Sequence, residues 1–274
     1  MKRLILVTLL VLAACSRSGV NPWLGYVEGE DALISPPQPG WITHLVVRRG
    51  QWINRGDLLF TLDDIHETAA RDQAAANLNS AKAQLQQELA NNIYTRVQLR
   101  RQTRLALVKA GTPTTYDAAL LGAQQSDRRV PQMEAQIKQM EGALADAEYQ
   151  LSQRRVVAYT SGRVEDIFFR EGEYAPASTP VVEILPPANI YVRFFIPETQ
   201  LQDVKLNQKV QISCDSCKPF DATVTFIAQQ EEFTAPDIFS VGNREKLVFK
   251  AEAHVPGGMK LNPGQPVEVR PLAQ

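Results

Sequence analysis

The sequence has 274 residues, 44% of them hydrophobic and 22% charged, which is the composition of an ordinary folded protein. Its 29 Lys and Arg against 30 Asp and Glu leave a formal net charge of -1. This balance argues against a nucleic-acid partner, because such a partner needs a basic face that displaces counterions from phosphate. No apolar stretch approaches the ~20 residues that a membrane-spanning helix requires.

Residues 1–14 are typical of an export signal. Lys2 and Arg3 give a positive start, and residues 4–12 are apolar but too few to span a bilayer. Small residues then lead directly to Cys15, and this pattern resembles the lipobox of bacterial lipoproteins. The resemblance implies that residues 1–14 are removed, that Cys15 carries acyl chains, and that residues 15–24 form a lipidated linker. An ordinary secretory signal is the alternative.

Residues 65–153 predict two long helices that form an antiparallel hairpin. Asp64 and Glu67 have the spacing of a capping box at the start of the first helix. Gly111 marks the expected end of that helix, and Thr112 with Pro113 has the chemistry of an N-cap and first helical residue. Apolar residues of the second helix recur in alternating steps of three and four, as in the seam of a two-stranded coiled coil: Val130, Met133, Ile137, Met140, Leu144, Ala147 and Leu151.

An internal repeat flanks this hairpin. Residues 40–62 and 162–184 alternate apolar and polar side chains around matching turns, at a constant offset of 122 residues. The glycines at the matching turns are Gly40 and Gly50 in the first copy and Gly162 and Gly172 in the second. Neither copy is large enough to bury a core alone. We therefore expect residues 25–64 and 154–186 to pack together as one β module, with the hairpin inserted between its halves.

Residues 187–274 predict a small β-barrel. Five stretches of apolar and polar alternation are separated by turn residues, at 190–196, 209–213, 222–227, 246–253 and 266–270. The sequence as a whole therefore predicts a mixed α+β multidomain protein.

This order of elements resembles that of the HlyD-type membrane fusion proteins, the periplasmic adaptors of bacterial export systems. Residues 39–50 and 56–59 are similar to the first half of the family's split lipoyl-like (biotinyl-lipoyl) module, into which an antiparallel coiled-coil α-hairpin is inserted. Residues 231–234 and 247–249 resemble the barrel of the subfamily that serves ABC-type exporters. The chain also ends soon after the barrel, which we expect for that subfamily rather than for adaptors of RND pumps.

The resemblance implies a protein that bridges membranes and catalyses no reaction. Its expected partners are an inner-membrane transporter, with an ABC permease and ATPase, an outer-membrane channel of the TolC type, and further copies of the chain in a ring. Its expected location is the periplasm, with the lipid in the inner membrane, although Ser16 after the cysteine favours the outer membrane under the sorting rule of enteric bacteria. An adaptor of an RND pump and a lipid-anchored envelope tether without a transport role are the alternatives.

The implied contact with the channel lies at the hairpin tip. Leu107 and Gly111 fit the family's pattern of Arg, Leu and Ser around a Gly, and Thr114 can replace the Ser. Arg101 and Arg104 do not fall at the family's spacing, so for them a solvated helix face is an equal alternative. The expected tip residues are Arg104, Leu107, Gly111, Thr112 and Thr114.

Cys214 and Cys217 are expected to form a local disulfide. A redox-active pair with this spacing normally lies at a helix N-terminus, whereas this pair lies between predicted strands. Metal binding needs further ligands, and the three histidines of the chain are scattered without ligand spacing. A disulfide across so short a loop restrains the turn and adds little global stability.

No catalytic residue, metal site or cofactor is predicted. The sequence has no phosphate-binding loop, no G-x-S-x-G motif and no paired zinc motif. A lipoate or biotin carrier needs a Lys at the junction of the two module halves, but that junction here reads Asp63-Asp64 and Arg154-Arg155. A carrier enzyme is therefore disfavoured.

Overall fold

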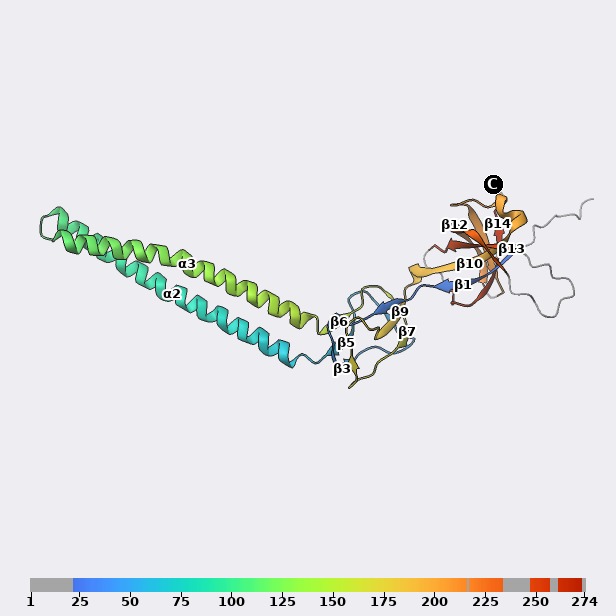
Figure 1. Cartoon of the computed structure of the whole chain (residues 1–274), viewed down its shortest axis with the longest axis horizontal. Coiled ribbons are helices and arrows are strands. Elements are labelled where there is room, and N and C mark those ends of the chain that lie inside the picture. Colours follow the sequence, from blue (N-terminus) through green and yellow to red (C-terminus); the bar gives the residue numbers. More distant parts are fainter. Residues whose placement is uncertain (1–21, 216, 234–246, 257–260, 273–274) are drawn as a thin grey trace, which may run out of the picture.

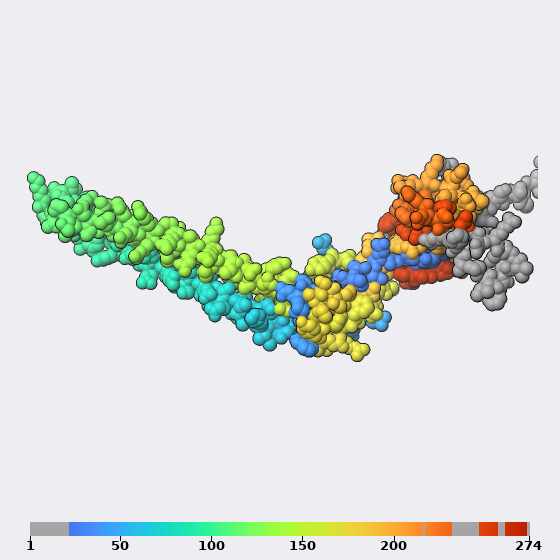
Figure 2. Space-filling model, in the orientation of Figure 1, coloured from blue at the N-terminus to red at the C-terminus, as the bar shows by residue number. Residues whose placement is uncertain are grey.

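The structure, a computed structural model, describes residues 22–215, 217–233, 247–256 and 261–272. It consists of three parts in a row: a long helical hairpin, a β module made of two sheets, and a closed barrel (Figure 1). Figure 2 shows the hairpin as a narrow arm that projects from the β module on the side away from the barrel. The predicted signal segment and Cys15 lie outside the described residues.

The prediction of a barrel in the last third of the chain is confirmed. Its strands follow the order β1-β10-β13-β12-β11-β14, and each strand pairs antiparallel with its neighbours. Two short 3-10 helices, Pro187–Asn189 and Glu198–Asp203, flank β10. The strands are β1 (Trp23–Gly29), β10 (Ile190–Pro197), β11 (Lys209–Cys214), β12 (Cys217–Phe233), β13 (Leu247–His254) and β14 (Pro266–Pro271).

Strand β1 corrects the predicted boundaries, which placed its residues in the linker 15–24 and in the first half of the module. β1 instead joins β10 and β14 and closes the barrel. Trp23 is buried and stacks on Phe194 with ring centroids 5.7 Å apart. At Gly25 a Cβ would lie only 2.3 Å from the carbonyl oxygen of Arg193, so only glycine lets the two strands approach this closely. Without β1 the barrel would be open between β10 and β14.

The β module between hairpin and barrel contains two four-stranded sheets with the orders β2-β9-β7-β4 and β6-β5-β3-β8. The two sheets are equivalent under the repeat offset. Shifting β6, β5, β3 and β8 by this offset gives β2, β9, β7 and β4 in turn, which is the strand order of the other sheet. Matching hydrogen bonds agree with this: Gly50 N donates to Val164 O and Gly172 N donates to Ile42 O, each at 2.8 Å. The strands are β2 (Ala32–Ile34), β3 (Gly40–Leu45), β4 (Trp52–Ile53), β5 (Leu58–Leu62), β6 (Arg155–Val157), β7 (Gly162–Ile167), β8 (Tyr174–Ala175) and β9 (Val182–Leu185).

The four repeat glycines have two different roles, which corrects their common assignment to turns. Gly50 and Gly172 do lie in turns, with φ of 77° and 84°. Gly40 and Gly162 instead begin strands β3 and β7. At Gly162 a Cβ would lie 2.4 Å from the carbonyl oxygen of Leu185, so this glycine permits close packing between strands.

Helices α2 (Ile65–Leu107) and α3 (Pro113–Ser152) form the arm. With 43 and 40 residues they extend roughly 60 Å. They pack against each other through a half-buried row whose α3 members between residues 130 and 151 include Val130, Ile137 and Leu144. Leu78 and Ala81 are the buried apolar residues of α2.

Two predicted helix-end features differ in the structure. Asp64 and Glu67 form no capping box. The backbone N–H of Ile65 donates to the Asp63 side chain at 3.2 Å, and the Glu67 carboxylate forms an ion pair with Arg154. At the other end of α2 the left-handed residue is Lys109, with φ of 60°, and not Gly111. Long-range pairing and the geometry of the tip override these local signals.

Candidate functional site

The free end of the hairpin is the candidate site for a partner. Leu107 and Val108 are 79% and 71% exposed there, at the C-terminal end of α2. The Thr112 hydroxyl accepts a hydrogen bond from the backbone N–H of Thr115 at 3.3 Å and so caps α3. The cap fixes the start of α3 at Pro113, five residues after Val108, while the side chains of Leu107 and Val108 lie in solvent.

The tip is also strongly basic. Residues 89–116 contain no Asp or Glu and carry Arg96, Arg100, Arg101, Arg104 and Lys109. All of these side chains are exposed. Since the chain as a whole is slightly acidic, this basic end is a local feature of the arm, and it favours a partner with acidic groups.

The structure brings the predicted tip residues to this end in different ways. Arg104 and Leu107 lie in the last turn of α2, and Thr112 and Thr114 lie at the start of α3. Arg104, Leu107, Thr112 and Thr114 are exposed, whereas Gly111 is half-buried. A Cβ at Gly111 would lie 3.3 Å from the Cβ of Leu105, so this glycine keeps the loop close to α2.

A polar cluster in the middle of the helical seam was missed by sequence reasoning. Ser126 is buried and donates to the Glu88 carboxylate at 2.9 Å. Asn92 and Arg96 donate to Asp127 at 2.7 Å and 2.9 Å, and these two hydrogen bonds hold the pKa of the Asp127 carboxyl below its ordinary value. Glu88 and Asn92 occupy seam positions in the heptad count, and this was the available signal. The cluster fixes which residues of α2 and α3 face each other.

The base of the hairpin is fastened to the module by one arginine. The Arg154 guanidinium bonds to the Glu67 carboxylate at 2.5 Å and to the carbonyl oxygen of Pro39 at 2.9 Å. Only 13% and 12% of the Arg154 and Glu67 side chains are exposed. The backbone of Arg154 also accepts a hydrogen bond from Leu62 N at 2.8 Å. Arg154 thus joins both ends of the hairpin to β5 and to the segment before β3.

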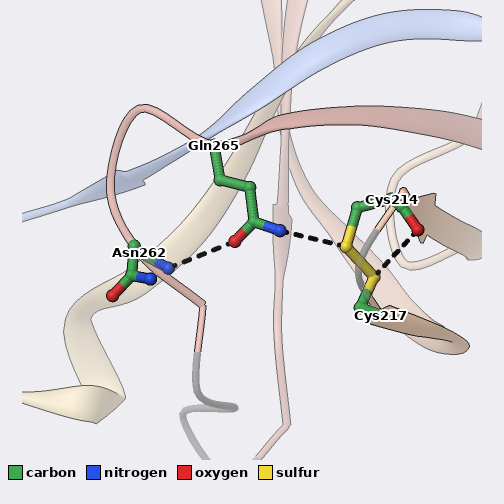
Figure 3. Close-up of a disulfide and its surroundings, with 4 residues drawn as sticks. All are labelled: Cys214, Cys217, Asn262 and Gln265. Atoms are coloured by element: carbon green, nitrogen blue, oxygen red, sulfur yellow. Dashed lines mark hydrogen bonds between the residues drawn. A yellow bond between two sulfur atoms is a disulfide. The ribbon is translucent and has the colours of Figure 1, made fainter.

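The Cys214–Cys217 disulfide closes the turn between β11 and β12, with an S–S distance of 2.05 Å. Figure 3 shows the Gln265 side chain reaching the disulfide, and its amide donates to the Cys214 sulfur at 3.1 Å. The same side chain accepts a hydrogen bond from Asn262 N at 3.5 Å. Because Gln265 O also accepts from Val27 N, the disulfide turn is connected to β1 at one end of the barrel.

An ion network crosses the outside of the barrel. Arg193 on β10 bonds to Glu28 on β1 at 2.6 Å and to Glu252 on β13 at 3.0 Å. The Tyr191 hydroxyl donates to Glu28 at 2.6 Å, and burial together with this carboxylate raises the pKa of Tyr191. The network holds β1 against its neighbours and offers no nucleophile or free base.

A carboxyl pair lies where the module meets the barrel. Asp31, just before β2, shares a hydrogen bond with Glu183 on β9. Burial raises the pKa of Glu183, and the nearby carboxylates of Asp31, Asp166 and Glu165 raise it further. Burial also raises the pKa of Asp31. The two carboxyls therefore bind protons more readily than isolated Asp and Glu side chains do.

The surface of the module carries two exposed tryptophans. Trp41 and Trp52 are 56% and 55% exposed. Trp41 makes an edge contact with Tyr174, with ring centroids 5.4 Å apart. Trp41 lies on β3 and Trp52 on β4, and alternation along a strand points every second side chain away from the module core.

Neither metal chemistry nor a membrane span finds support in the part of the chain that the structure describes. No three His, Cys, Asp or Glu side chains of the described ranges are grouped so that they could hold a metal ion. None of the described helices has the length and apolar character that crossing a membrane requires.

Comparisons with known proteins give two relatives of interest; no protein-family model matches the sequence. The uncharacterized protein YdhJ of Escherichia coli is 30% identical over 195 residues, a match that covers 70% of this chain and 63% of YdhJ. The multidrug resistance protein MdtA of Proteus mirabilis is 30% identical over 191 residues, covering 68% of this chain and 43% of MdtA. This chain therefore spans less than two thirds of the length of either relative.

Two solved structures share the architecture. MacA from Actinobacillus actinomycetemcomitans has a TM-score of 0.70 and 20% identity, with 92% of this chain and 79% of MacA covered. The membrane fusion protein Spr0693 from Streptococcus pneumoniae has a TM-score of 0.59 and 14% identity, with 92% of this chain and 98% of that protein covered. This chain therefore has the fold of a membrane fusion protein.

Proposed function

We propose that this protein is the periplasmic adaptor of an efflux or secretion system. In this role it is not an enzyme: it bridges an inner-membrane exporter, of the ABC type, and an outer-membrane channel of the TolC type. Copies of the chain form a ring, and the Cys15 lipid anchors each copy to the inner membrane. The fold shared with MacA and Spr0693 and the name of the relative MdtA support an adaptor of an efflux system.

The hairpin tip is the observation that carries this proposal. A helical arm of roughly 60 Å has no use in burying a core, since its outer faces are solvated along most of their length. Its free end combines the exposed Leu107 and Val108 with the four arginines and one lysine of residues 89–116. Exposed apolar side chains beside exposed cations are the composition of a docking surface.

The domain roles follow from this assignment. We propose that the two-sheet module is the lipoyl-like part, built from residues 30–64 and 154–186, and that it serves as a rigid base for the arm. The Arg154 contacts with Glu67 and Pro39 support this role because they join the base of the arm to the module. The barrel, residues 23–29 with 187–274, is proposed to face the exporter, and the resemblance of residues 231–234 to the ABC subfamily supports that partner.

A photocrosslinking experiment in the native host tests the proposal. A photoreactive residue replaces Leu107 at the tip, and the matched control replaces Ile65, which lies on the same helix at its other end and is equally exposed at 76%. A third variant carries the photoreactive residue at Leu206 on the barrel, 58% exposed. We expect Leu107 to capture an outer-membrane channel of the TolC type, Ile65 to capture none, and Leu206 to capture an inner-membrane transporter.

The captured partners separate the proposal from its alternatives. An RND transporter at Leu206 would replace the ABC exporter but leave the adaptor role in place. Capture of no channel at Leu107 and no transporter at Leu206, in protein that is intact and lipidated, would leave the envelope tether as the function. A carrier enzyme would instead show covalently bound lipoate or biotin on the intact chain by mass spectrometry.

A further inference from the structure

The two sulfurs of the Cys214–Cys217 disulfide have unequal surroundings. Both cysteines are half-buried, and Cys214 packs against the hydrophobic core of the barrel whereas Cys217 does not. Cys217 instead begins β12 and is followed by the exposed Lys218. Cys214 therefore carries the inner sulfur of the pair, and Cys217 carries the outer one.

The inner sulfur receives a hydrogen bond from the side chain of Gln265, whose amide nitrogen donates to Cys214 Sγ at 3.1 Å (Figure 3). The orientation of this amide is fixed from its other side. The backbone N–H of Asn262 donates to the Gln265 side-chain oxygen at 3.5 Å, and an N–H group can bond only to the oxygen of an amide. The nitrogen of the amide, which only donates, therefore faces the sulfur.

These contacts decide which sulfur leaves when the disulfide is attacked. Thiol–disulfide exchange proceeds by attack of a thiolate on one sulfur while the other sulfur departs as a thiolate. The Gln265 N–H stabilises a negative charge on Cys214 Sγ. A negative charge on Cys217 Sγ would instead lie 3.8 Å from the carbonyl oxygen of Cys214. Cys214 is thus the better leaving group, and Cys217 carries the sulfur that is open to attack.

The flanking charges favour the same direction of attack. Lys218 follows Cys217 and Asp215 follows Cys214, and both charged side chains are exposed. The lysine attracts an incoming thiolate towards the outer sulfur, and the aspartate repels it from the inner one. The Asp215 carboxylate also disfavours charge on Cys214, but water screens it, so the direct contact with Gln265 dominates there.

Gln265 takes the part that a helix N-terminus plays in other redox-active pairs. Such pairs receive N–H groups from the first turn of a helix, and these groups stabilise one thiolate. Here the pair lies between β11 and β12, and the N–H comes from a side chain 51 residues after Cys214. The bond also closes a loop between residues only three apart. A disulfide across so short a loop stabilises the fold little, and by linkage the fold does equally little to oppose its reduction.

We propose that the Cys214–Cys217 disulfide is an exchange site for a dithiol, and that the dithiol attacks Cys217. In the first step a thiolate of the dithiol bonds to Cys217 Sγ, the bond between the two cysteines breaks, and its electron pair leaves on Cys214 Sγ beside Gln265. In the second step the other sulfur of the dithiol attacks its partner in the mixed disulfide, and Cys217 leaves. The dithiol is oxidised to a disulfide, and the cysteine pair gains two electrons and two protons. This inference is independent of the proposed function.

Glutathione exchange on the full chain, purified from its host, tests the direction of attack. Short incubations with reduced glutathione are quenched with acid and free thiols are blocked with a maleimide. Peptide mass spectrometry then shows which cysteine carries glutathione. We expect roughly tenfold more glutathione on Cys217 than on Cys214 at the earliest times, the factor that one hydrogen bond to a charged group supplies. Glutathione first on Cys214 or equally on both, or folded protein that forms neither the mixed disulfide nor free thiols, overturns the inference.

Variants at Gln265 separate stabilisation of the leaving sulfur from simple packing of the turn. Gln265→Leu removes the N–H donor. Gln265→Glu keeps an oxygen for the Asn262 N–H but places a carboxylate against the sulfur. We expect reduction by dithiothreitol to slow roughly tenfold in Gln265→Leu and further in Gln265→Glu. If the side chain only packed the turn, both variants would expose the disulfide and speed its reduction, and that result would overturn the inference.

The matched control is Gln208→Leu. The Gln208 side chain accepts a hydrogen bond from the backbone N–H of Lys205 at 2.8 Å, three residues earlier, as Gln265 does from Asn262. Gln208 precedes β11, however, and so lies at the end of that strand away from Cys214. We expect its rate of reduction to equal that of the wild type, and equal slowing in both glutamine variants would overturn the inference. The glutathione experiment needs no substitution, so it decides even if a variant fails to fold.

Discussion

Removing the arginine at the base of the hairpin gives the sharpest test of how the arm is held. The variant Arg154→Met keeps the length of the side chain but leaves the Glu67 carboxylate without its partner, in a site where only 12% of that side chain is exposed. Removing one partner of a buried ion pair lowers the free energy of unfolding by roughly 3–5 kcal/mol, because the remaining charge is left desolvated and unpaired. The hydrogen bond to the Pro39 carbonyl oxygen, 2.9 Å long, is lost as well.

We expect a loss of about 3 kcal/mol in the free energy of unfolding of the module, or roughly 10 °C or more in Tm for a unit of this size. The double variant Arg154→Met with Glu67→Met should recover most of the loss, since apolar residues of similar volume can replace a buried pair. The matched control is Arg163→Met, which breaks an exposed pair of the same module: Arg163 lies 2.8 Å from Glu165, and the two side chains are 44% and 33% exposed. Its expected cost is below ~1 kcal/mol.

Differential scanning calorimetry of the full chain measures these changes. The reasoning requires that the single variants Arg154→Met and Glu67→Met be coupled in a double-mutant cycle. Additive losses would show that the two side chains stabilise the module independently, and would refute the role of the pair as a clamp. A loss for Arg163→Met as large as that for Arg154→Met would show that burial does not decide the cost.

Three further predictions concern the module and the barrel. The raised pKa values of Glu183 and Asp31 mean that their contribution to stability is present below their ordinary values of 4.5 and 3.8 and is lost as the pH rises through the raised values. Glu183→Gln should therefore raise the Tm at pH 7, with a gain that shrinks towards pH 4; a lower Tm at pH 7 would contradict this sign. Gly25→Ala should destabilise the barrel by about 3 kcal/mol in chemical denaturation, since its Cβ would meet a backbone oxygen at 2.3 Å. The control Gly122→Ala should instead stabilise α3 by up to ~1 kcal/mol, since its Cβ would have nothing within 4 Å. Phe194→Ala should cost about 3–5 kcal/mol in the same assay, because the ring is fully buried in the barrel; a cost below ~1 kcal/mol would show that the core collapses around the gap.

Local patterns in the sequence were sufficient for the elements whose structure repeats over short distances. The seam positions from Val130 to Leu151 alternate in steps of three and four, and all of them are half-buried in the structure. Thr112 and Pro113 begin that helix with the side-chain cap that their chemistry predicts. Four barrel strands of the last third, β10, β11, β13 and β14, were visible because each alternates buried with half-buried or exposed side chains over at least five residues.

The choice of long-range partners was not visible in the same way. Strand β1 has only two buried apolar side chains, Trp23 and Val27, and nothing near it in the sequence shows that it pairs with β10 and β14. The capping signal of Glu67 was correct in its spacing, yet Arg154 lies 87 residues later and forms the stronger, buried interaction. The end of the first helix was predicted at Gly111, but the residue with the left-handed backbone conformation at the tip is Lys109.

The sequence by itself determined the two helices, the repeat and five of the six barrel strands, because hydrogen bonds within a helix and alternation along a strand depend on neighbours a few residues away. Only the tertiary structure decided that β1 closes the barrel, that Arg154 fastens the arm, and that Asn92 of α2 meets Asp127 of α3. These features depend on which distant residues meet in space. Competing pairings have similar local patterns, so burial and hydrogen bonding summed over the whole fold select among them.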